Sequence, residues 1–222
     1  MKGVRRLLTS PDEVLNQLVA ASTMPGWATA TIPLSQFQSY AGRRGWEPIA
    51  TRRGDSAVAN LTPTAAAAAP ARSISATAGL DAQMLHVDGA HLYAVPDIVV
   101  MHSETVSSTI TRIWRPKFEI LNSSALKHGV FIVGVGRDSF LACAYDYNGL
   151  RFDPYCMAPA DSRSREAYDL LTSYEGVHEH VWSEPNTLLL IRNRKVLHGR
   201  AKTVEGENRE LTRIAYKTGP LR

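Results

Sequence analysis

Short apolar runs follow one another along the chain from about residue 84 onward. They are rich in β-branched and aromatic residues and are separated by Gly, Pro, Asn or Asp, which is typical of strands joined by turns. Seven or eight such strands with few helices indicate a sandwich or barrel, and we predict a mainly β fold with flanking helices and a double-stranded β-helix (jelly roll) core. The runs lie at 97–104, 107–114, 129–136, 139–147, 178–183, 186–193 and 211–218.

Helical signals are few. Residues 10–22 open with Ser10 as a candidate N-cap and Pro11 at the first helical position, and their apolar residues recur with helical spacing. Residues 34–45 and 164–175 have similar patterns. We therefore expect a helical N-terminal support and one further helix within the β region.

The segment 62–75, "TPTAAAAAPARSIS", has low complexity. Polyalanine favours a helix, but Pro63 and Pro70 bracket the run, so a helix and a mobile loop both remain open. Its position just before residue 84 would suit a lid, and an ordinary surface loop fits equally well. We predict a single domain over 1–222, with helical support in 1–60 and the jelly-roll core in 60–218.

Composition narrows the class of protein. A chain of 222 residues that is 44% hydrophobic and 21% charged is typical of one globular domain with a substantial core. The net charge of +4 would suit an anionic ligand, but the Lys and Arg residues are scattered, which argues against nucleic-acid binding. Cys143 and Cys156 form no disulfide framework, residues 1–10 lack the apolar core of a signal peptide, and no apolar run approaches 18 residues. We expect a cytoplasmic protein without a membrane span.

The stretch "MLHVDGAH", residues 84–91, carries candidate metal ligands. In an extended segment, residues two apart point to the same face, so His86 and Asp88 would project together. One imidazole and one carboxylate are two thirds of the facial triad that holds non-haem iron. Because such a pair is common by chance, the stretch alone favours a half-buried polar strand.

Two later stretches change that balance. The buried run 185–201 passes through a tight turn and ends on His198, a polar group that must find a partner if it is buried. Eleven residues later comes Arg209, followed four residues on by Arg213, and on a strand these two would share a face. A guanidinium binds a carboxylate in bidentate fashion. The set His, Asp, His, Arg fits non-haem iron with a dicarboxylate cosubstrate.

The chain resembles the iron(II)/2-oxoglutarate-dependent dioxygenases of the taurine dioxygenase and clavaminate synthase group. The resemblance lies in "LHVDGAHL", "NTLLLIRNRKVLHGRA" and "ENRELTR", with "GLRFDPYCM" at 149–157 similar to a segment of the clavaminate synthase side. It covers roughly residues 60–218. Two departures are the short separation of 110 residues between Asp88 and His198, and Arg192 at a position where the group often has Asp.

The resemblance implies a role for each matching residue. His86, Asp88 and His198 would bind Fe(II), and Arg209 would hold the distal carboxylate of 2-oxoglutarate. The group often has a Thr after its first motif; here Thr109 or Thr111 would contact the cosubstrate, and both remain open. Arg213 would assist the cosubstrate or meet an anionic group of the substrate.

The implied activity is oxidation of a small molecule such as an amino acid or a natural-product intermediate, with O2 consumed and succinate and CO2 released. The carboxylate of Asp88 favours hydroxylation, desaturation or ring formation over halogenation, because related halogenases lack it. Two alternatives stay open: a cupin-like metal-binding isomerase or sensor that does not use 2-oxoglutarate, and an oxygenase acting on nucleic acid. We expect a small-molecule substrate and no nucleic-acid or membrane partner.

Overall fold

The computed structural model describes residues 10–52, 55–71, 73–134, 136–207 and 209–219. The prediction that no signal peptide opens the chain falls on residues that lie almost entirely outside this described part. Among the described residues, no helix has the length and apolar character needed to cross a membrane. The helices are α1 (Pro11–Ala21), α2 (Leu34–Arg43), α3 (Ile74–Ala78), α4 (Phe118–Leu121), α5 (Ser124–His128) and α6 (Ser162–Thr172), with 3-10 turns at Ala66–Ala68 and Gly136–Asp138.

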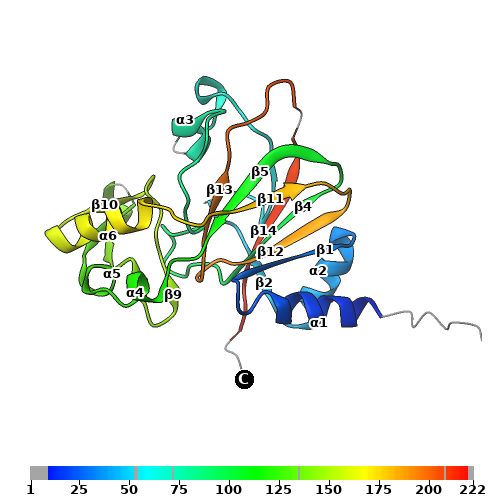
Figure 1. The fold of residues 1–222 in the computed structure, drawn as a ribbon, viewed down its shortest axis with the longest axis horizontal. Helices are drawn as coiled ribbons and strands as arrows, with labels where there is room; N and C mark the ends of the chain where they lie inside the picture. Colours follow the sequence, from blue (N-terminus) through cyan, green and yellow to red (C-terminus); the bar gives the residue numbers. More distant parts are fainter. Residues whose placement is uncertain (1–9, 53–54, 72, 135, 208, 220–222) are drawn as a thin grey trace, which may run out of the picture.

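The larger of the β-sheets runs through the middle of the molecule (Figure 1). Its strands are antiparallel in the order β1-β12-β4-β14-β2, and β3 also pairs with β14. The bounds are β1 (Trp27–Thr31), β2 (Glu47–Ile49), β3 (Val58–Leu61), β4 (Ile98–Ser103), β12 (Thr187–Arg192) and β14 (Leu211–Lys217). The segment 1–60, predicted as helical support, thus also contributes three strands.

A second antiparallel sheet has the order β11-β5-β13, formed by β11 (His178–Trp182), β5 (Ser107–Trp114) and β13 (Leu197–Arg200). Apolar side chains from both sheets form one buried cluster, including Val99 and Leu189 of the larger sheet and Ile113 and Trp182 of the smaller one. Two antiparallel sheets around a shared core are the arrangement of a jelly roll, so the predicted fold class is confirmed.

The outer face of the larger sheet is also buried, against α1 and α2. Along β12, Leu189 faces the inter-sheet core, whereas Leu188 and Leu190 pack with Leu15 and Phe37 of the two helices. A strand buried on both faces reads as a continuous apolar run, which is why "TLLLI" shows no alternation. Ser10 caps α1 as predicted, since its hydroxyl accepts a hydrogen bond from the Glu13 N–H at 3.2 Å.

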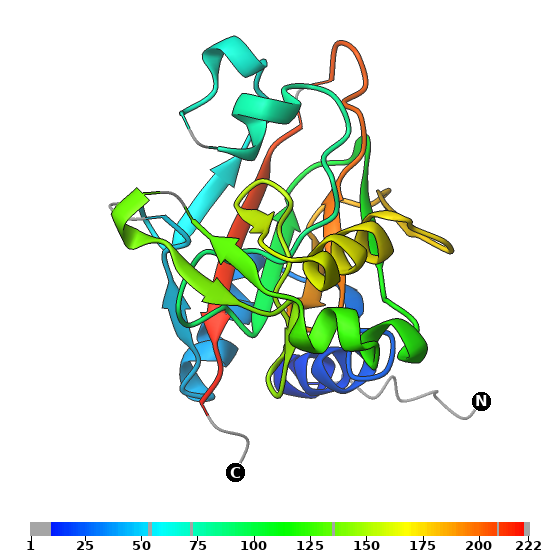
Figure 2. The same cartoon turned by 90° about the vertical axis from the view of Figure 1, so that its left-hand side faces the viewer.

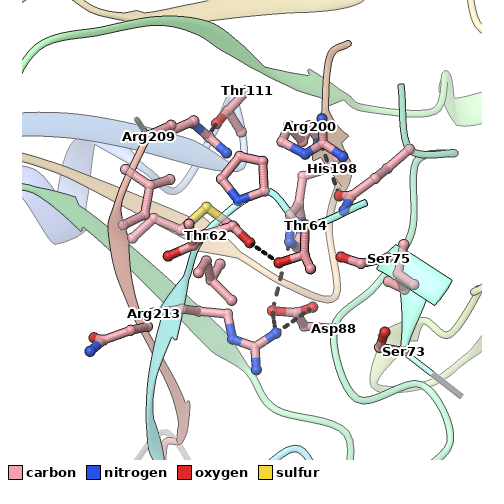
Figure 3. Close-up of a pocket in the computed structure, with 18 of the residues that line it drawn as sticks. Thr62, Thr64, Ser73, Ser75, Asp88, Thr111, His198, Arg200, Arg209 and Arg213 are labelled. Atoms are coloured by element: carbon pink, nitrogen blue, oxygen red, sulfur yellow. Dashed lines mark hydrogen bonds and ion pairs between the residues drawn. The ribbon is translucent and has the colours of Figure 1, made fainter. Parts of the chain in front are cut away.

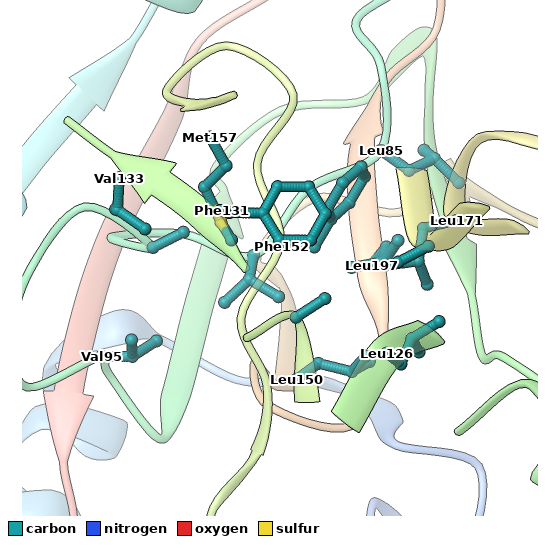
Figure 4. Packing of buried hydrophobic residues seen from close by; sticks show 14 of the residues in the cluster. Leu85, Val95, Leu126, Phe131, Val133, Leu150, Phe152, Met157, Leu171 and Leu197 are labelled. Atoms are coloured by element: carbon teal, nitrogen blue, oxygen red, sulfur yellow. The ribbon is translucent and has the colours of Figure 1, made fainter. Parts of the chain in front are cut away.

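A third buried cluster lies beside the two sheets, in the region that follows β5. It unites α5, α6 and the short strands β6 (Phe131–Val133), β7 (Phe140–Ala142), β8 (Tyr145–Asp146), β9 (Gly149–Leu150) and β10 (Met157–Pro159). This region (green to yellow) faces the viewer in Figure 2. Phe131 and Phe152 pack edge to face at its centre, and Leu85 and Leu197 join it from the metal-ligand stretches (Figure 4).

The structure refines several predicted elements. The run 139–147 is divided between β7 and β8, because the carbonyl of Ala144 accepts from the N–H of Arg151 rather than from a continuing ladder. The Ala-rich segment is neither one helix nor featureless: Ala66–Ala68 forms a 3-10 turn, and Ser73 caps the short helix α3 through its hydroxyl. The short helices α4 and α5 had no clear sequence signal.

We predict that Leu190→Ala lowers the free energy of unfolding by about 2–5 kcal/mol, because the substitution leaves a cavity between β12 and the helices. Leu141→Ala is the matched control: Leu141 is also on a strand, but it is 69% exposed and should change stability by no more than about 0.5 kcal/mol. Urea unfolding measures both. Equal losses would contradict the assignment of Leu190 to the core.

Candidate metal centre

The stretch that carries His86 and Asp88 is extended but belongs to no regular strand. It lies beside β13, with which it forms an isolated antiparallel bridge between His86 and His198. The N–H of each of these residues donates to the carbonyl of the other at 2.9 Å. The N–H of Gln83 donates to the carbonyl of Arg200, also at 2.9 Å. The bridge places the two histidines opposite each other, although they are far apart in the sequence.

Further N–H groups of this stretch donate hydrogen bonds to residues of the region after β5, where a regular sheet would have a neighbouring strand. The N–H of Met84 donates to the hydroxyl of Tyr155 at 2.8 Å, and the N–H of Leu85 donates to that of Tyr174 at 3.0 Å. The N–H of Val87 donates to the carbonyl of Phe152 at 2.7 Å. The segment 149–157, noted for its resemblance, therefore supports the ligand stretch, since buried N–H groups need partners.

Asn193 holds the backbone of Asp88, a role that sequence reasoning missed. Its side-chain oxygen accepts from the Asp88 N–H at 2.9 Å, and its amide nitrogen donates to the carbonyls of Asp88 and Pro96, each at 2.9 Å. Asn193 is fully buried. In the sequence, Asn193 lies among charged residues at the turn between two apolar stretches, and nothing there marks it as a buried group.

Two glycines next to the ligands allow close backbone approach. A Cβ atom on Gly199 would lie 3.1 Å from the carbonyl oxygen of Met84, which is tight, so glycine lets the ligand stretch pack against β13. Gly89 has a φ of +67°, and a Cβ there would lie 2.9 Å from Pro96. These contacts explain the glycines in "HVDG" and "LHGR".

The three predicted iron ligands converge. One potential ligand atom each from His86, Asp88 and His198 lies within 4.8 Å of the other two, and all three residues are buried. The Nε2 atom of His86 is 3.5 Å from one carboxylate oxygen of Asp88, and the Nε2 atom of His198 is 3.9 Å from the other. Two imidazole nitrogens and a carboxylate therefore face a common point.

Charges around this point determine the protonation of the three groups. Burial alone would raise the pKa of Asp88, but the Arg213 guanidinium and the adjacent His198 and His86 rings hold that pKa well below its usual range. Burial lowers the pKa of His198, and Asp88 only partly opposes this. For His86, burial is outweighed by the adjacent Asp88 carboxylate and by the charge of Asp153, so its pKa is raised.

The donor set fits a ferrous ion. Among the described residues, neither ring nitrogen of the buried His198 has a hydrogen-bond partner, although the Nε2 atom points toward Asp88. A buried polar atom of this kind requires a partner. The Nδ1 atom of His86 faces the Met84 carbonyl at 2.9 Å, an arrangement that leaves its Nε2 lone pair free for a metal. Two imidazoles and one carboxylate are the facial set of non-haem iron(II) sites.

Arg209 lies at the far side of the same cavity, just before β14. Its Nη2 atom donates to the Thr111 hydroxyl at 2.9 Å, and Thr111 in turn accepts from the indole N–H of Trp182 at 3.1 Å. Among the described residues, no carboxylate lies within ion-pair distance of the Arg209 guanidinium, and its buried Nε has no hydrogen-bond partner. Burial and the nearby Arg200 lower the pKa of Arg209 to about 10, so it stays charged at neutral pH.

The two candidate threonines differ in their surroundings. Thr111 lines the cavity and contacts Arg209, whereas Thr109 lies outside the cavity lining. The Thr109 hydroxyl donates to the carboxylate of Glu207 and accepts from the N–H of Val204 at 3.1 Å. Of the two, the structure therefore brings only Thr111 together with the other site residues.

Arg213 lies on the opposite side of the cavity from Arg209 (Figure 3). Its Nη1 atom is 3.2 Å from a carboxylate oxygen of Asp88, and its Nη2 atom donates to the Thr51 hydroxyl at 2.6 Å. The two arginines both line the cavity, but they do not share a strand face as predicted: Arg213 lies on β14, whereas Arg209 precedes it, and they contact different groups. Arg213 is thus directly beside the candidate metal ligands.

The cavity has a volume of about 310 Å³, near the lower end of the range for small-molecule sites. One wall is the metal triad with Thr111, Arg200 and Arg209. The facing wall comes from the Ala-rich segment, through Thr62, Thr64, Ser73 and Ser75 (Figure 3). Residues on both sides of the alanine run therefore line the site.

Comparisons with known proteins show the fold. No protein-family model matches the chain, and no curated protein matches it. Among solved structures, the chain is similar to the non-haem iron oxygenase OrfP in complex with Fe, succinate and (3S)-hydroxy-L-Arg, with 15% identity, a TM-score of 0.67, and coverage of 92% of this chain and 80% of that one.

Two further solved structures are similar. An asparagine oxygenase in complex with Fe(II), 2S,3S-3-hydroxyasparagine and succinate has 16% identity and a TM-score of 0.67, over 92% of this chain and 78% of that one. OrfP in complex with Fe and α-ketoglutaric acid has 19% identity and a TM-score of 0.61, over 82% and 62%. The predicted resemblance is therefore confirmed at the level of the fold.

We predict that Asn193→Ala weakens both folding and metal binding. The substitution leaves the N–H and carbonyl of Asp88 and the carbonyl of Pro96 without this partner, so the free energy of unfolding should fall by about 2–4 kcal/mol. Metal affinity should fall by roughly 10–100-fold, because Asp88 is no longer held in place. Urea unfolding and a titration with Co(II), followed by its visible absorption, measure the two effects.

The control is Asn122→Ala, which removes an exposed asparagine that caps a short helix away from the cavity. Both quantities should stay near their unmodified values. If Asn193→Ala bound Co(II) as tightly as the unmodified protein, the role given to the amide would be wrong.

Proposed function

We propose that the chain is a non-haem iron(II)/2-oxoglutarate-dependent oxygenase that hydroxylates a small molecule, with an amino acid as the substrate class. One observation carries the proposal: a buried His, Asp, His triad shares its cavity with the buried guanidinium of Arg209, and within the described part of the chain neither the His198 ring nor this guanidinium has a polar or charged partner of the kind it needs. A metal ion bound by the triad and an anion bound by the Arg209 guanidinium would supply the missing partners. The similar solved structures hold iron, α-ketoglutaric acid or succinate, and hydroxylated amino acids, which supports the same assignment.

His86, Asp88 and His198 would hold the iron. A bound ferrous ion supplies the oxidising chemistry, which consumes O2 and 2-oxoglutarate and releases succinate and CO2. The three residues line one wall of the cavity, so the rest of the cavity would be open to further ligands of the metal. The protein's part is to fix these groups, and the backbone bridge together with Asn193 does so.

Arg209 and Thr111 would hold the distal carboxylate of 2-oxoglutarate. The guanidinium is buried, charged and already oriented by Thr111, so a carboxylate gains a charge-assisted hydrogen bond without reorganisation of the site. Trp182 fixes the Thr111 hydroxyl from behind. The same contacts argue against a metal-binding isomerase or sensor, for which a buried cation without a counter-charge would only destabilise the fold.

Arg213 would serve the substrate side. Its partner in this structure is Asp88, a carboxylate that would belong to the metal once iron is bound. The guanidinium would then be available to the carboxylate of an amino acid beside the iron. The Ala-rich segment would limit access of water from the other side, since its hydroxyl-bearing residues line the cavity.

We predict that Arg209→Ala raises the dissociation constant of 2-oxoglutarate by about 100-fold, because removal of one partner of a buried charge pair costs about 2–5 kcal/mol. The measurement is the visible charge-transfer absorption of the anaerobic complex with Fe(II) and 2-oxoglutarate. Arg165→Ala, which truncates an exposed arginine on α6, is the control and should bind normally. Unchanged binding by Arg209→Ala, or no iron- and 2-oxoglutarate-dependent succinate formation by the unmodified protein, would refute the proposed function.

The two threonines give a second, matched prediction. Thr111→Val removes the hydroxyl that contacts Arg209 and should raise the dissociation constant of 2-oxoglutarate by roughly 5–10-fold. Thr109→Val removes a hydroxyl that contacts Glu207 and Val204 and should change it by less than about twofold. The reverse order would assign the cosubstrate contact to Thr109.

A further inference from the structure

The charge balance of the cavity is one-sided. The chain has 21 acidic residues, and all of them lie in the part that the structure describes. Of these, Asp88 alone lines the cavity. Four arginines line it: Arg52, Arg200, Arg209 and Arg213. Once Asp88 binds the metal, no carboxylate of the described chain is left facing the space for a substrate.

Two acidic residues whose charges act on the site, Glu207 on Arg209 and Asp153 on His86, are hydrogen-bonded elsewhere. Glu207 accepts from the Ser108 N–H at 2.6 Å and from the Thr109 hydroxyl. Asp153 accepts from the Tyr155 N–H at 2.9 Å and from the thiol of Cys156 at 3.3 Å. Neither is free to turn into the cavity without breaking these contacts.

The other two arginines of the cavity, Arg200 and Arg52, keep their positive charges. The Arg200 guanidinium donates to the carbonyls of Gly79 at 2.6 Å and Leu80 at 3.0 Å, which satisfies its donors but leaves its charge. Arg52 is exposed at the cavity rim. Because charges interact over several ångströms in a partly buried site, the space between them disfavours a further cation and favours an anion.

The remaining lining offers neutral hydrogen-bonding groups. Thr62, Thr64, Ser73 and Ser75 bring hydroxyls from the Ala-rich segment, and Asn60 and Gln83 bring carboxamides. Among the described residues, no Phe, Tyr or Trp lines the cavity, so a cation–π contact is not available to replace a carboxylate.

We propose that the substrate is a small α-amino acid whose side chain is neutral and polar or anionic, and that the cavity rejects side chains carrying an ammonium or guanidinium group. This inference rests on the proposed function and specifies its substrate class. The hydroxyls and carboxamides of the wall would bind an amide or hydroxyl group of such a side chain. With Arg209 paired to the cosubstrate and Arg213 to the substrate's own carboxylate, a cationic side chain would still meet the positive charges of Arg52 and Arg200. Apart from Asp88 on the metal, no carboxylate of the described chain faces the cavity to receive it.

The test uses the unmodified protein with Fe(II) and 2-oxoglutarate under anaerobic conditions. Amino acids are titrated while the charge-transfer absorption is followed, in pairs of similar size: L-citrulline with L-arginine, and L-asparagine with L-2,4-diaminobutyrate, together with L-aspartate and L-glutamate. In each pair of which either member binds, we expect the neutral member to shift the band and the cationic member to bind more than about tenfold more weakly. Succinate formation in air, stimulated by the same compounds, is the second readout.

A cationic member that binds as tightly as its neutral partner would overturn the inference, and so would a panel in which no compound shifts the band. Either result leaves the assignment as an iron(II)/2-oxoglutarate-dependent oxygenase standing if the band itself forms. Absence of the band with iron and 2-oxoglutarate alone would instead count against the proposed function. The two failures are therefore distinguishable.

A gain of binding provides an independent test. Ser75→Asp places a carboxylate on the cavity wall and should shift the preference within a pair toward the cationic member by about tenfold or more. Ser35→Asp is the matched control, because Ser75 and Ser35 are each the second residue of a helix, but Ser35 is exposed on α2. The spectrum with iron and 2-oxoglutarate is recorded first for both variants. An unchanged preference in a Ser75→Asp protein that forms the band would contradict the inference.

Discussion

The pair of backbone hydrogen bonds between His86 and His198 is the constraint on which the candidate metal centre depends. It ties an irregular extended stretch to β13, so two imidazoles separated by more than a hundred residues face the same point. A side chain alone could not achieve this, because its rotamers would move the ring by ångströms. Gly199 contributes by allowing the two backbones to approach. The geometry of the ligands is thus a consequence of backbone pairing.

The ligand stretch is unusual in how its buried N–H groups are satisfied. On one side it pairs with β13, and on the other side two tyrosine hydroxyls, one carbonyl and the amide of Asn193 take the place of a neighbouring strand. Most of these partners come from the region after β5, whose own core contains Phe131 and Phe152. The region after β5 therefore supports the site as much as the two sheets do. Its structural role is to provide hydrogen-bond acceptors for the stretch that carries His86 and Asp88.

The electrostatics of the cavity follow from the same architecture. The triad places one buried carboxylate between two histidines and Arg213, while Arg209, on the far side, has no counter-charge within the described part of the chain. A buried charge without a partner costs stability. A divalent cation at the triad and a dicarboxylate at Arg209 would offset that cost. The distribution of charge is therefore a reason to expect both ligands.

The sequence by itself determined the fold class, the helix at residues 11–21 and the identity of the candidate ligands, because strand runs, an N-cap and the motif residues are local signals. The spacing of Arg209 and Arg213 suggested one strand face, but the structure has Arg209 before β14, so their common cavity comes from the tertiary fold. Only the tertiary structure separated Thr111 from Thr109, since both lie on the same face of β5 and differ only in what lies beyond them. It alone revealed the role of Asn193 and the tyrosines, because contacts across 70 to 105 residues leave no periodic pattern in a single sequence. The charge balance of the cavity was likewise invisible beforehand: 21 acidic residues are spread along the chain, and the fold decides that only one of them faces the site.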